Sequence, residues 1–302
     1  MSFQLHADQG IQKNIRRIAR QQIDKAINEI DDTELDRHEA IHQVRKRCKK
    51  LRGLIRLVQP VLGSSYQREN AGFKEIADAL AVLRDEQSLV EVLEDLLASL
   101  KPSERKQFNP VLQNLCERRD AAASRSGQNP DVLLAETRKQ LKTIRKRVAR
   151  WRLDTEGYPA VRGGFKLTYK RGRKTMKQAY KSEQASDFHE WRKRVKYHMH
   201  HLKLLDLLWP DVTKVWRKQT KALADILGQD HDLALLRELL SVEGKSLADD
   251  ALRQQLSAVI AKEQQRLRAQ AWSIGQRFHA EKPKALNKRW KRYWQVWQSA
   301  GT

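Results

Sequence analysis

One basic motif occurs twice in this chain, and the repetition limits the possible folds more than any other feature. The pattern H-x-x-R-K-R-x-K begins at His42 and returns 147 positions later at His189. Read as helices, both copies sort their residues into an apolar stripe and a separate basic stripe. The basic stripes consist of His42, Arg45, Lys46, Lys49 and Arg52 in the first copy and of His189, Arg192, Lys193 and Lys196 in the second. The apolar stripe is typical of core packing, whereas core packing does not explain the basic stripe.

Other segments repeat in the same order at nearly the same offset. Residues 80–93 match residues 227–240 at 147 positions, and cations near the start and end of each half match at 153 and 146 positions. These cations are Lys13, Arg17, Arg20, Lys142 and Arg145 in the first half and Lys166, Lys170, Arg173, Lys288 and Lys291 in the second. We therefore predict an internal duplication, with a first helical repeat over residues 1–156 and a second over residues 157–302, together forming one domain.

The composition predicts helices throughout. Glycine and proline are scarce, helix-favouring residues dominate, and no alternating run is long enough to predict a strand. We expect an all-α fold of two helical bundles related by a pseudo-two-fold axis. The glycine- and proline-containing segment 155–164 is interpreted as the connection between the halves.

The charge of the chain is strongly one-sided. Sixty Lys and Arg residues against 37 Asp and Glu residues give a net charge of +23, which favours nucleic acid, an anionic membrane or a phosphate polymer as partner. A single basic helix face is most often a solvated surface, but such faces usually mix both signs of charge. The repeated basic stripes contain almost no acidic residue. We therefore expect them to line a central basic pore or groove that holds a linear anion.

The histidine pattern favours phosphate contact or helix orientation over metal binding. His42 and His189 lie among cations, which favour the neutral imidazole near pH 7. The histidines at positions 198, 200 and 201 and the pair His231-Asp232 lack the spacing of a zinc site, so we interpret them as structural or surface residues.

Enzyme signatures are absent from the sequence, which contains no P-loop, dinucleotide fingerprint or nucleophile elbow. Asp85, Asp230 and Asp232 are interpreted as helix caps or arginine partners rather than as a catalytic set. We expect no catalytic residue, no cofactor and no metal.

The location of the protein is predicted from its cysteines and its hydropathy. Cys48 falls on the apolar stripe of the first motif and is far from Cys116, so a buried free thiol in a reducing compartment is expected. No apolar run approaches the roughly 20 residues of a membrane span, and no secretory signal is evident. These features predict a cytoplasmic protein without a membrane span.

At these motifs the sequence resembles the CHAD family, the conserved histidine α-helical domain. The resemblance rests on the two histidine motifs, on residues 169–173 and on the leucine-rich segments 80–85 and 227–232, and it extends over essentially the whole chain. Members of that family are paired helical bundles around a basic pore that binds inorganic polyphosphate. The resemblance therefore implies phosphate contacts by His42, Arg45, Lys49 and Arg52, with His189, Arg192 and Lys196 as equivalents.

The chain also departs from the family pattern. His198 and Met199 stand where the first copy has Leu51 and Arg52, which implies a weaker grip by the second half. Many relatives carry an N-terminal triphosphate-tunnel domain marked by an E-x-E-x-K strand. This sequence has nothing similar, so no triphosphatase activity is expected.

The leading prediction is a non-enzymatic polyphosphate-binding protein, with polyphosphate granules as an expected location and the oligomeric state left open. The alternative is an RNA- or single-stranded-DNA-binding protein in which Trp290, Trp294 and Trp297 stack on bases. Their helical spacing favours core packing instead, which leaves nucleic acid as a competing ligand. A less favoured alternative is a phosphotransferase or metal hydrolase acting through His42 and His189.

Overall fold

A computed structural model describes residues 3–81, 85–125 and 129–300, and the regular elements in these ranges are all helical. The all-α prediction is therefore confirmed. The helices of the first half are α1 (Ile11–Asp31), α2 (Arg37–Leu57), η1 (Gln59–Val61), α3 (Ser64–Ala79), α4 (Asp85–Ala98), α5 (Pro102–Lys106), α6 (Asn109–Arg125) and α7 (Pro130–Val148). Those of the second half are α8 (Gly157–Ser182), α9 (Ala185–Leu204), η2 (Asp206–Leu208), α10 (Pro210–Val242), η3 (Gly244–Ser246), α11 (Asp250–Phe278) and α12 (Pro283–Ser299).

Local sequence sets the limits of the first motif helix. The carboxylate of Asp36 accepts hydrogen bonds from the backbone N–H groups of His38 and Glu39, at 2.9 and 3.1 Å, and so caps the start of α2. The helix ends at Leu57, shortly before Pro60, whose ring is incompatible with a continuing helix. The apolar stripe of α2 is fully buried, and it includes Cys48.

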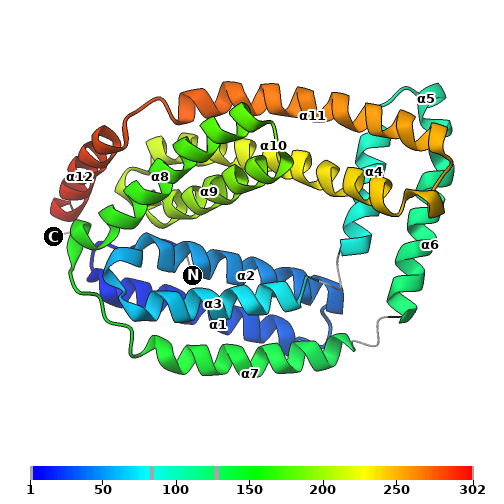
Figure 1. Ribbon diagram of the computed structural model, residues 1–302. Coiled ribbons are helices and arrows are strands. Elements are labelled where there is room, and N and C mark those ends of the chain that lie inside the picture. The colour runs from blue at the N-terminus through cyan, green and yellow to red at the C-terminus, as the bar shows by residue number, and fades with distance from the viewer. Residues whose placement is uncertain (1–2, 82–84, 126–128, 301–302) are drawn as a thin grey trace.

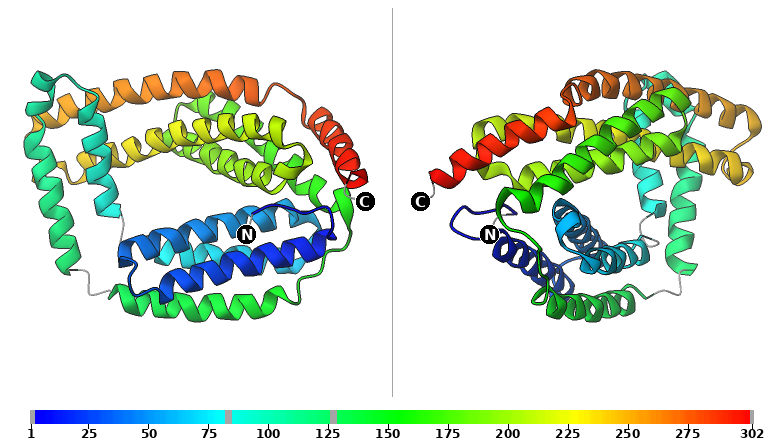
Figure 2. Two further views of the ribbon diagram at one scale, coloured as in Figure 1. Left: turned by 180° about the vertical axis from the view of Figure 1, so that it is seen from behind. Right: turned by 60° about the vertical axis from the view of Figure 1, so that its left-hand side comes forward.

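The molecule has two main layers of helices (Figure 1). One layer contains α1, α2, α3 and α7, and the other contains α8, α9 and α10, with α11 and α12 packed on its outer side. At one end α4 and α6 run between the layers, which is also visible from behind and from the side (Figure 2). There α4 packs on α10 and shares an apolar core with α6, α10 and α11. Helices on either side of position 156 thus build one common core.

The two motif helices, α2 and α9, cross in direct contact. The imidazole Nε2 of His201 donates a hydrogen bond to the carbonyl oxygen of Gly53 at 3.1 Å. The guanidinium of Arg56 lies 4.2 Å from the centre of the Tyr197 ring. These contacts hold the two basic stripes in a fixed relation to each other.

Gly163 and Gly164 do not belong to a connecting loop, as the sequence had indicated, but lie inside α8. A Cβ atom at Gly164 would come within 2.2 Å of the carbonyl oxygens of Arg56 and Leu57, so the missing side chain lets α8 pack closely on α2. The connection is shorter than predicted and ends at Glu156, whose carboxylate accepts hydrogen bonds from the backbone of Ile11 at 2.7 Å and Gln12 at 3.2 Å.

Candidate functional site

The second basic stripe lies along α9 next to α10. Burial lowers the pKa of Arg192, and burial together with the neighbouring Arg192 lowers the pKa of Lys196 to about 8. The Nε of Arg192 is buried and has no hydrogen-bond partner among the described residues. Asp225 and Asp232 of α10 favour the charged forms of both cations but do not offset their burial. An anion entering here would meet cations that have already lost much of their water.

His231 of α10 lies within the electrostatic reach of this whole stripe. Burial, followed by the charges of His189, Arg192, Lys196 and Lys193, lowers its pKa to about 3. The rings of His189 and His231 have their centres 4.1 Å apart, and the pKa of His189 is also lowered, chiefly by burial. Both imidazoles are therefore neutral near pH 7, as predicted for His189.

The two basic stripes meet at His200, where α9 crosses α2. Burial and then the charges of Lys50, Lys196 and Lys49 lower the pKa of His200 to about 3. Lys49 and Lys50 belong to the first half and Lys196 to the second. Cations from both halves therefore act on one imidazole at the crossing of the helices.

Lys50 is the functional candidate that the sequence analysis missed. Its pKa is lowered to about 8 by burial and by the nearby cations Arg47, Lys46 and Lys25. Glu29 offsets this only in part, because its carboxylate also forms an ion pair with Arg47. The second motif has Tyr197 in place of Lys50. The repeated motif reveals only the residues that both copies share, so it does not reveal Lys50, which directly follows Lys49.

The remaining first-stripe residues also have roles within the fold. Arg45 donates to the carbonyl oxygen of Leu80 at 3.4 Å, and Arg52 donates to Asn70 of α3 at 3.3 Å. Lys46 is exposed and His42 is half-buried. The first stripe thus combines contacts to α3 with cationic surface.

A second group of predicted cations lies between α1 and α7. Lys13, Arg17, Arg20 and Arg145 line a cavity of about 480 Å³. Arg145 forms an ion pair with Asp24 in the same cavity. Arg17 donates to the carbonyl oxygen of Gln4 at 2.9 Å, which fastens the N-terminal segment, and Lys142 is exposed on α7. Arg17 and Arg145 therefore already form contacts within the fold.

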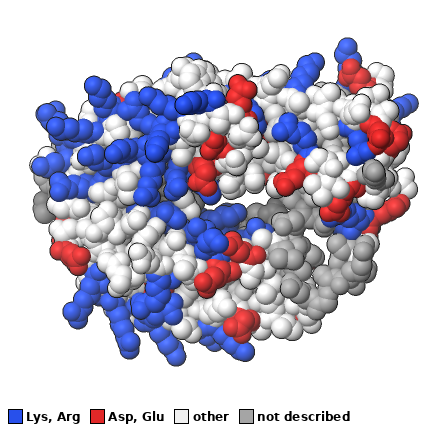
Figure 3. All heavy atoms as spheres, in the orientation of Figure 1, with Lys and Arg blue, Asp and Glu red and all other residues white. Residues whose placement is uncertain are grey.

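A third group covers the outside of the second layer. Lys166 and Lys170 of α8 and Lys288 and Lys291 of α12 are exposed, and the two helices pack together. Arg173 is half-buried beside His279, whose pKa of about 3 reflects burial and then this charge. Lys and Arg gather where α8, α9 and α12 lie, and the surface is hollowed between α2 and the α9–α10 pair (Figure 3).

Comparison with known proteins identifies the family. The family model described as "CHAD domain" matches residues 17–241, which is most of the chain. The chain belongs to the CHAD family. Among solved structures, this CHAD domain is similar to the crystal structure of the CHAD domain from the plant Ricinus communis, at 19% sequence identity and a TM-score of 0.63. That match covers 93% of this chain and 96% of the other. No curated protein matches.

Neither a membrane-spanning helix nor a cluster of metal ligands is present among the described residues. Within the ranges 3–81, 85–125 and 129–300, no helix of this CHAD domain combines the length and apolar character needed to cross a bilayer. The same ranges contain no group of three or more His, Cys, Asp and Glu side chains arranged to hold a metal ion. The side chain of Asp85 lies outside the described residues, so its expected capping role stays a prediction.

Three C-terminal tryptophans and two histidines of the CHAD domain belong to its core. Trp290 and Trp294 are 1% and 5% exposed, and Trp297 packs against the same core, so the core interpretation is confirmed. His198 and His201 are also buried, at 1% and 0% exposure, which confirms a structural role. Because these tryptophans pack in or against the core, they do not support nucleic-acid binding by base stacking.

Proposed function

We propose that this CHAD domain binds inorganic polyphosphate along α2 and α9 and does not hydrolyse it. The observation that carries the proposal is the crossing of α2 and α9 at Gly53 and His200. It brings Lys49 and Lys50 of one half and Lys196 of the other within electrostatic reach of the same imidazole, that of His200. The first stripe, from His42 to Arg52, extends over roughly 15 Å at the rise of an α-helix, which is enough for several phosphate groups. A linear anion lying across the helix crossing contacts cations of both halves.

The electrostatics of the free protein support this proposal. Half-buried cations such as Lys50 and Lys196 have lost hydration, and their depressed pKa values record the free-energy penalty. A polyphosphate chain supplies closely spaced negative charges that accept charge-assisted hydrogen bonds from them. Binding therefore restores stability that the crowding of like charges removes.

Binding without turnover is part of the proposal. Imidazoles with pKa values near 3, such as those of His200 and His231, are weak proton acceptors at neutral pH and so make poor general bases. The expected result is an unchanged polyphosphate chain length after long incubation with the protein and divalent metals. Phosphate release that disappears in His42→Ala with His189→Ala would instead support a phosphotransferase or hydrolase.

Fluorescence anisotropy tests the binding itself. Long-chain polyphosphate is compared with RNA and single-stranded DNA of matched charge at physiological salt, and tighter binding of polyphosphate is expected. Lys50→Met with Lys196→Met should weaken polyphosphate binding strongly. Lys139→Met with Lys262→Met, which removes two exposed lysines from α7 and α11, serves as the charge-matched control. Equal affinity for all three polymers contradicts the proposed specificity.

The location follows from the ligand. We propose that the protein resides in the cytoplasm and associates there with polyphosphate granules. Imaging of a tagged protein should show granule staining that weakens in the double lysine variant. Uniform staining in cells rich in granules contradicts this.

A further inference from the structure

A cavity of about 990 Å³ opens beside the cations of α9, and its chemistry differs from that of a polyphosphate channel. It lies between the first turn of α9, the C-terminal half of α10 and α11. Ala234, Leu235 and Ala258 give its wall an apolar character. Linear polyphosphate has no apolar part, so phosphate binding alone does not explain this wall.

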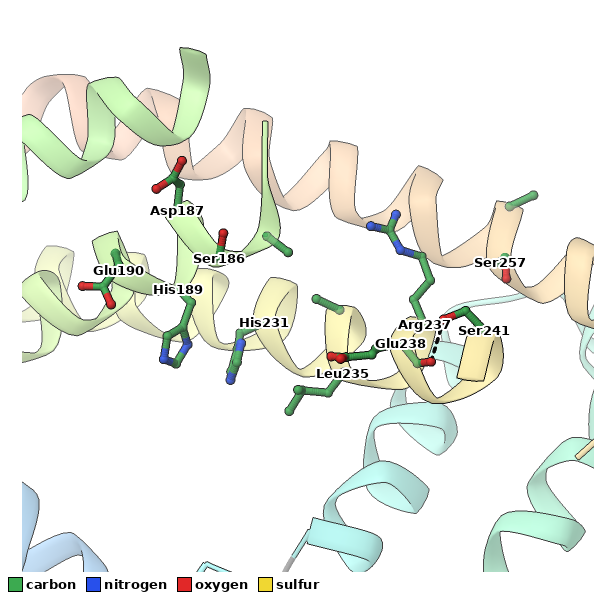
Figure 4. Close-up of a pocket in the computed structure, with 13 residues that line it drawn as sticks. Ser186, Asp187, His189, Glu190, His231, Leu235, Arg237, Glu238, Ser241 and Ser257 are labelled. Atoms are coloured by element: carbon green, nitrogen blue, oxygen red, sulfur yellow. Dashed lines mark hydrogen bonds between the residues drawn. The ribbon is translucent and has the colours of Figure 1, made fainter. Parts of the chain in front are cut away.

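Two neutral imidazoles stand at the side of the cavity. His189 and His231 point the same way from α9 and α10, and their ring planes are inclined by 40° (Figure 4). The Nδ1 of His189 is buried and has no hydrogen-bond partner among the described residues. Flat rings with one donor and one acceptor nitrogen can stack on a heteroaromatic base and hydrogen-bond to its edge.

The same imidazoles connect the cavity to the basic stripe of α9. Lys193 and Arg192 act electrostatically on His189, and both of them together with Lys196 act on His231. A ligand that fits both regions needs a planar, uncharged head for the cavity and a tail of negative charges for the stripe.

We propose that this cavity receives the base of a nucleoside polyphosphate whose phosphates extend onto Arg192, Lys193 and Lys196. The inference rests on the proposed phosphate-binding stripe and adds a second class of ligand to it. Ser186 and Arg237 also line the cavity and can contact the sugar or the edge of the base. The carboxylates of Asp187, Glu190 and Glu238 line it too, and Glu190 forms an ion pair with Lys193. These carboxylates repel phosphate, so the cavity itself favours the uncharged base. The protein then distinguishes a nucleotide from an inorganic chain of equal length.

Isothermal titration calorimetry with ATP and inorganic tripolyphosphate tests the inference. Both ligands have three phosphates, but the inorganic chain has one more ionisable end, so a purely electrostatic site prefers tripolyphosphate. We expect ATP to bind about tenfold more tightly, the equilibrium effect of one stacked base. Equal affinities, or a preference for tripolyphosphate, would overturn the inference.

Two variants on α11 locate the effect. Ala258→Trp fills the cavity from an exposed position, so the protein should fold and should lose its preference for ATP. Ala269→Trp, at an exposed alanine of the same helix that does not line the cavity, should retain it. An ATP preference that survives Ala258→Trp would overturn the inference.

The proposed function is tested separately, because long-chain polyphosphate should bind both variants and the wild type alike. A wild-type protein that binds long chains but shows no ATP preference contradicts only the cavity assignment. A protein that prefers ATP but binds no long chain contradicts only the proposed function.

Discussion

Gly53 and His200 lie against each other where α2 crosses α9, so closely that a Cβ atom on Gly53 would come within 2.7 Å of the Cβ of His200. The two residues are separated by the same 147 positions as the two histidine motifs. A two-fold axis between the repeats would bring equivalent residues into contact in this way. The contact also fixes the distance between the cations of the two halves.

Gly53→Ala should therefore separate α2 from α9. Because the neighbouring atom is a Cβ rather than the end of a flexible side chain, we expect a loss of stability of about 1–3 kcal/mol. Urea unfolding measures it. Gly72→Ala in α3 is the control, since its Cβ would meet only Ile144 Cδ1 at 3.4 Å and alanine favours the helix. Equal stability of both variants would contradict the close-packing argument.

Polyphosphate affinity should fall between pH 7 and pH 9. Lys50 and Lys196 have pKa values of about 8, so they lose their charge well below the usual lysine range, and affinity should drop on the order of tenfold. Anisotropy titrations at constant ionic strength measure this. Lys50→Arg with Lys196→Arg keeps both charges, so the affinity of this variant should change little between pH 7 and pH 9. A decline of the same size in that variant would assign the effect to other groups.

Lys196→Met should stabilise the free protein at pH 7 while weakening polyphosphate binding. The folded-state pKa of Lys196 lies below that of the unfolded chain, so its charge destabilises the fold below about pH 8 and ceases to do so as pH rises towards 10.5. We expect a gain on the order of 1–3 kcal/mol at pH 7 that shrinks by pH 10. Urea unfolding at both pH values checks the sign. A loss of stability at pH 7 would mean that Lys196 supports the fold.

His198→Leu should make the protein less sensitive to acid. His198 stacks on Phe165 at 4.9 Å, and burial lowers its pKa well below 6.5. The unfolded chain binds a proton there that the folded chain does not, so stability falls below pH 6.5 by up to about 1.4 kcal/mol per pH unit. Leucine is the residue at the equivalent position of the first motif, Leu51. A leucine at position 198 binds no proton, so this pH-dependent loss of stability disappears. Between pH 7 and pH 4, the free energy of unfolding of the variant should fall less steeply with decreasing pH than that of the wild type. An equally steep fall would contradict this account.

The sequence predicted the helical class because helical spacing is visible in one dimension. It did not predict that the two motif helices, α2 and α9, cross in direct contact. It misread Gly163 and Gly164, since close packing of α8 on α2 and a loop both favour glycine. It missed Lys50, whose depressed pKa arises from burial that only the assembled helices create. Whether the predicted site residues contact phosphate stays a prediction.

The packing of α4 also lay outside what the repeat could predict. Residues 80–93 and 227–240 match in sequence, yet the second segment lies inside the continuous helix α10, whereas the first passes from the end of α3 into α4. In the structure α4 packs on α10 instead of continuing the bundle of the first half.

Because α4 and α6 share a core with α10 and α11, neither repeat covers its own apolar surface. A protein of one repeat length would need a second copy to complete this core, as a domain-swapped homodimer does. Covalent linkage makes that association intramolecular, so the surface between the two halves, where we propose that polyphosphate binds, forms at any protein concentration. Under the predicted duplication, the linkage also lets the two motifs differ, as Lys50 does from its equivalent Tyr197 and Leu51 from its equivalent His198.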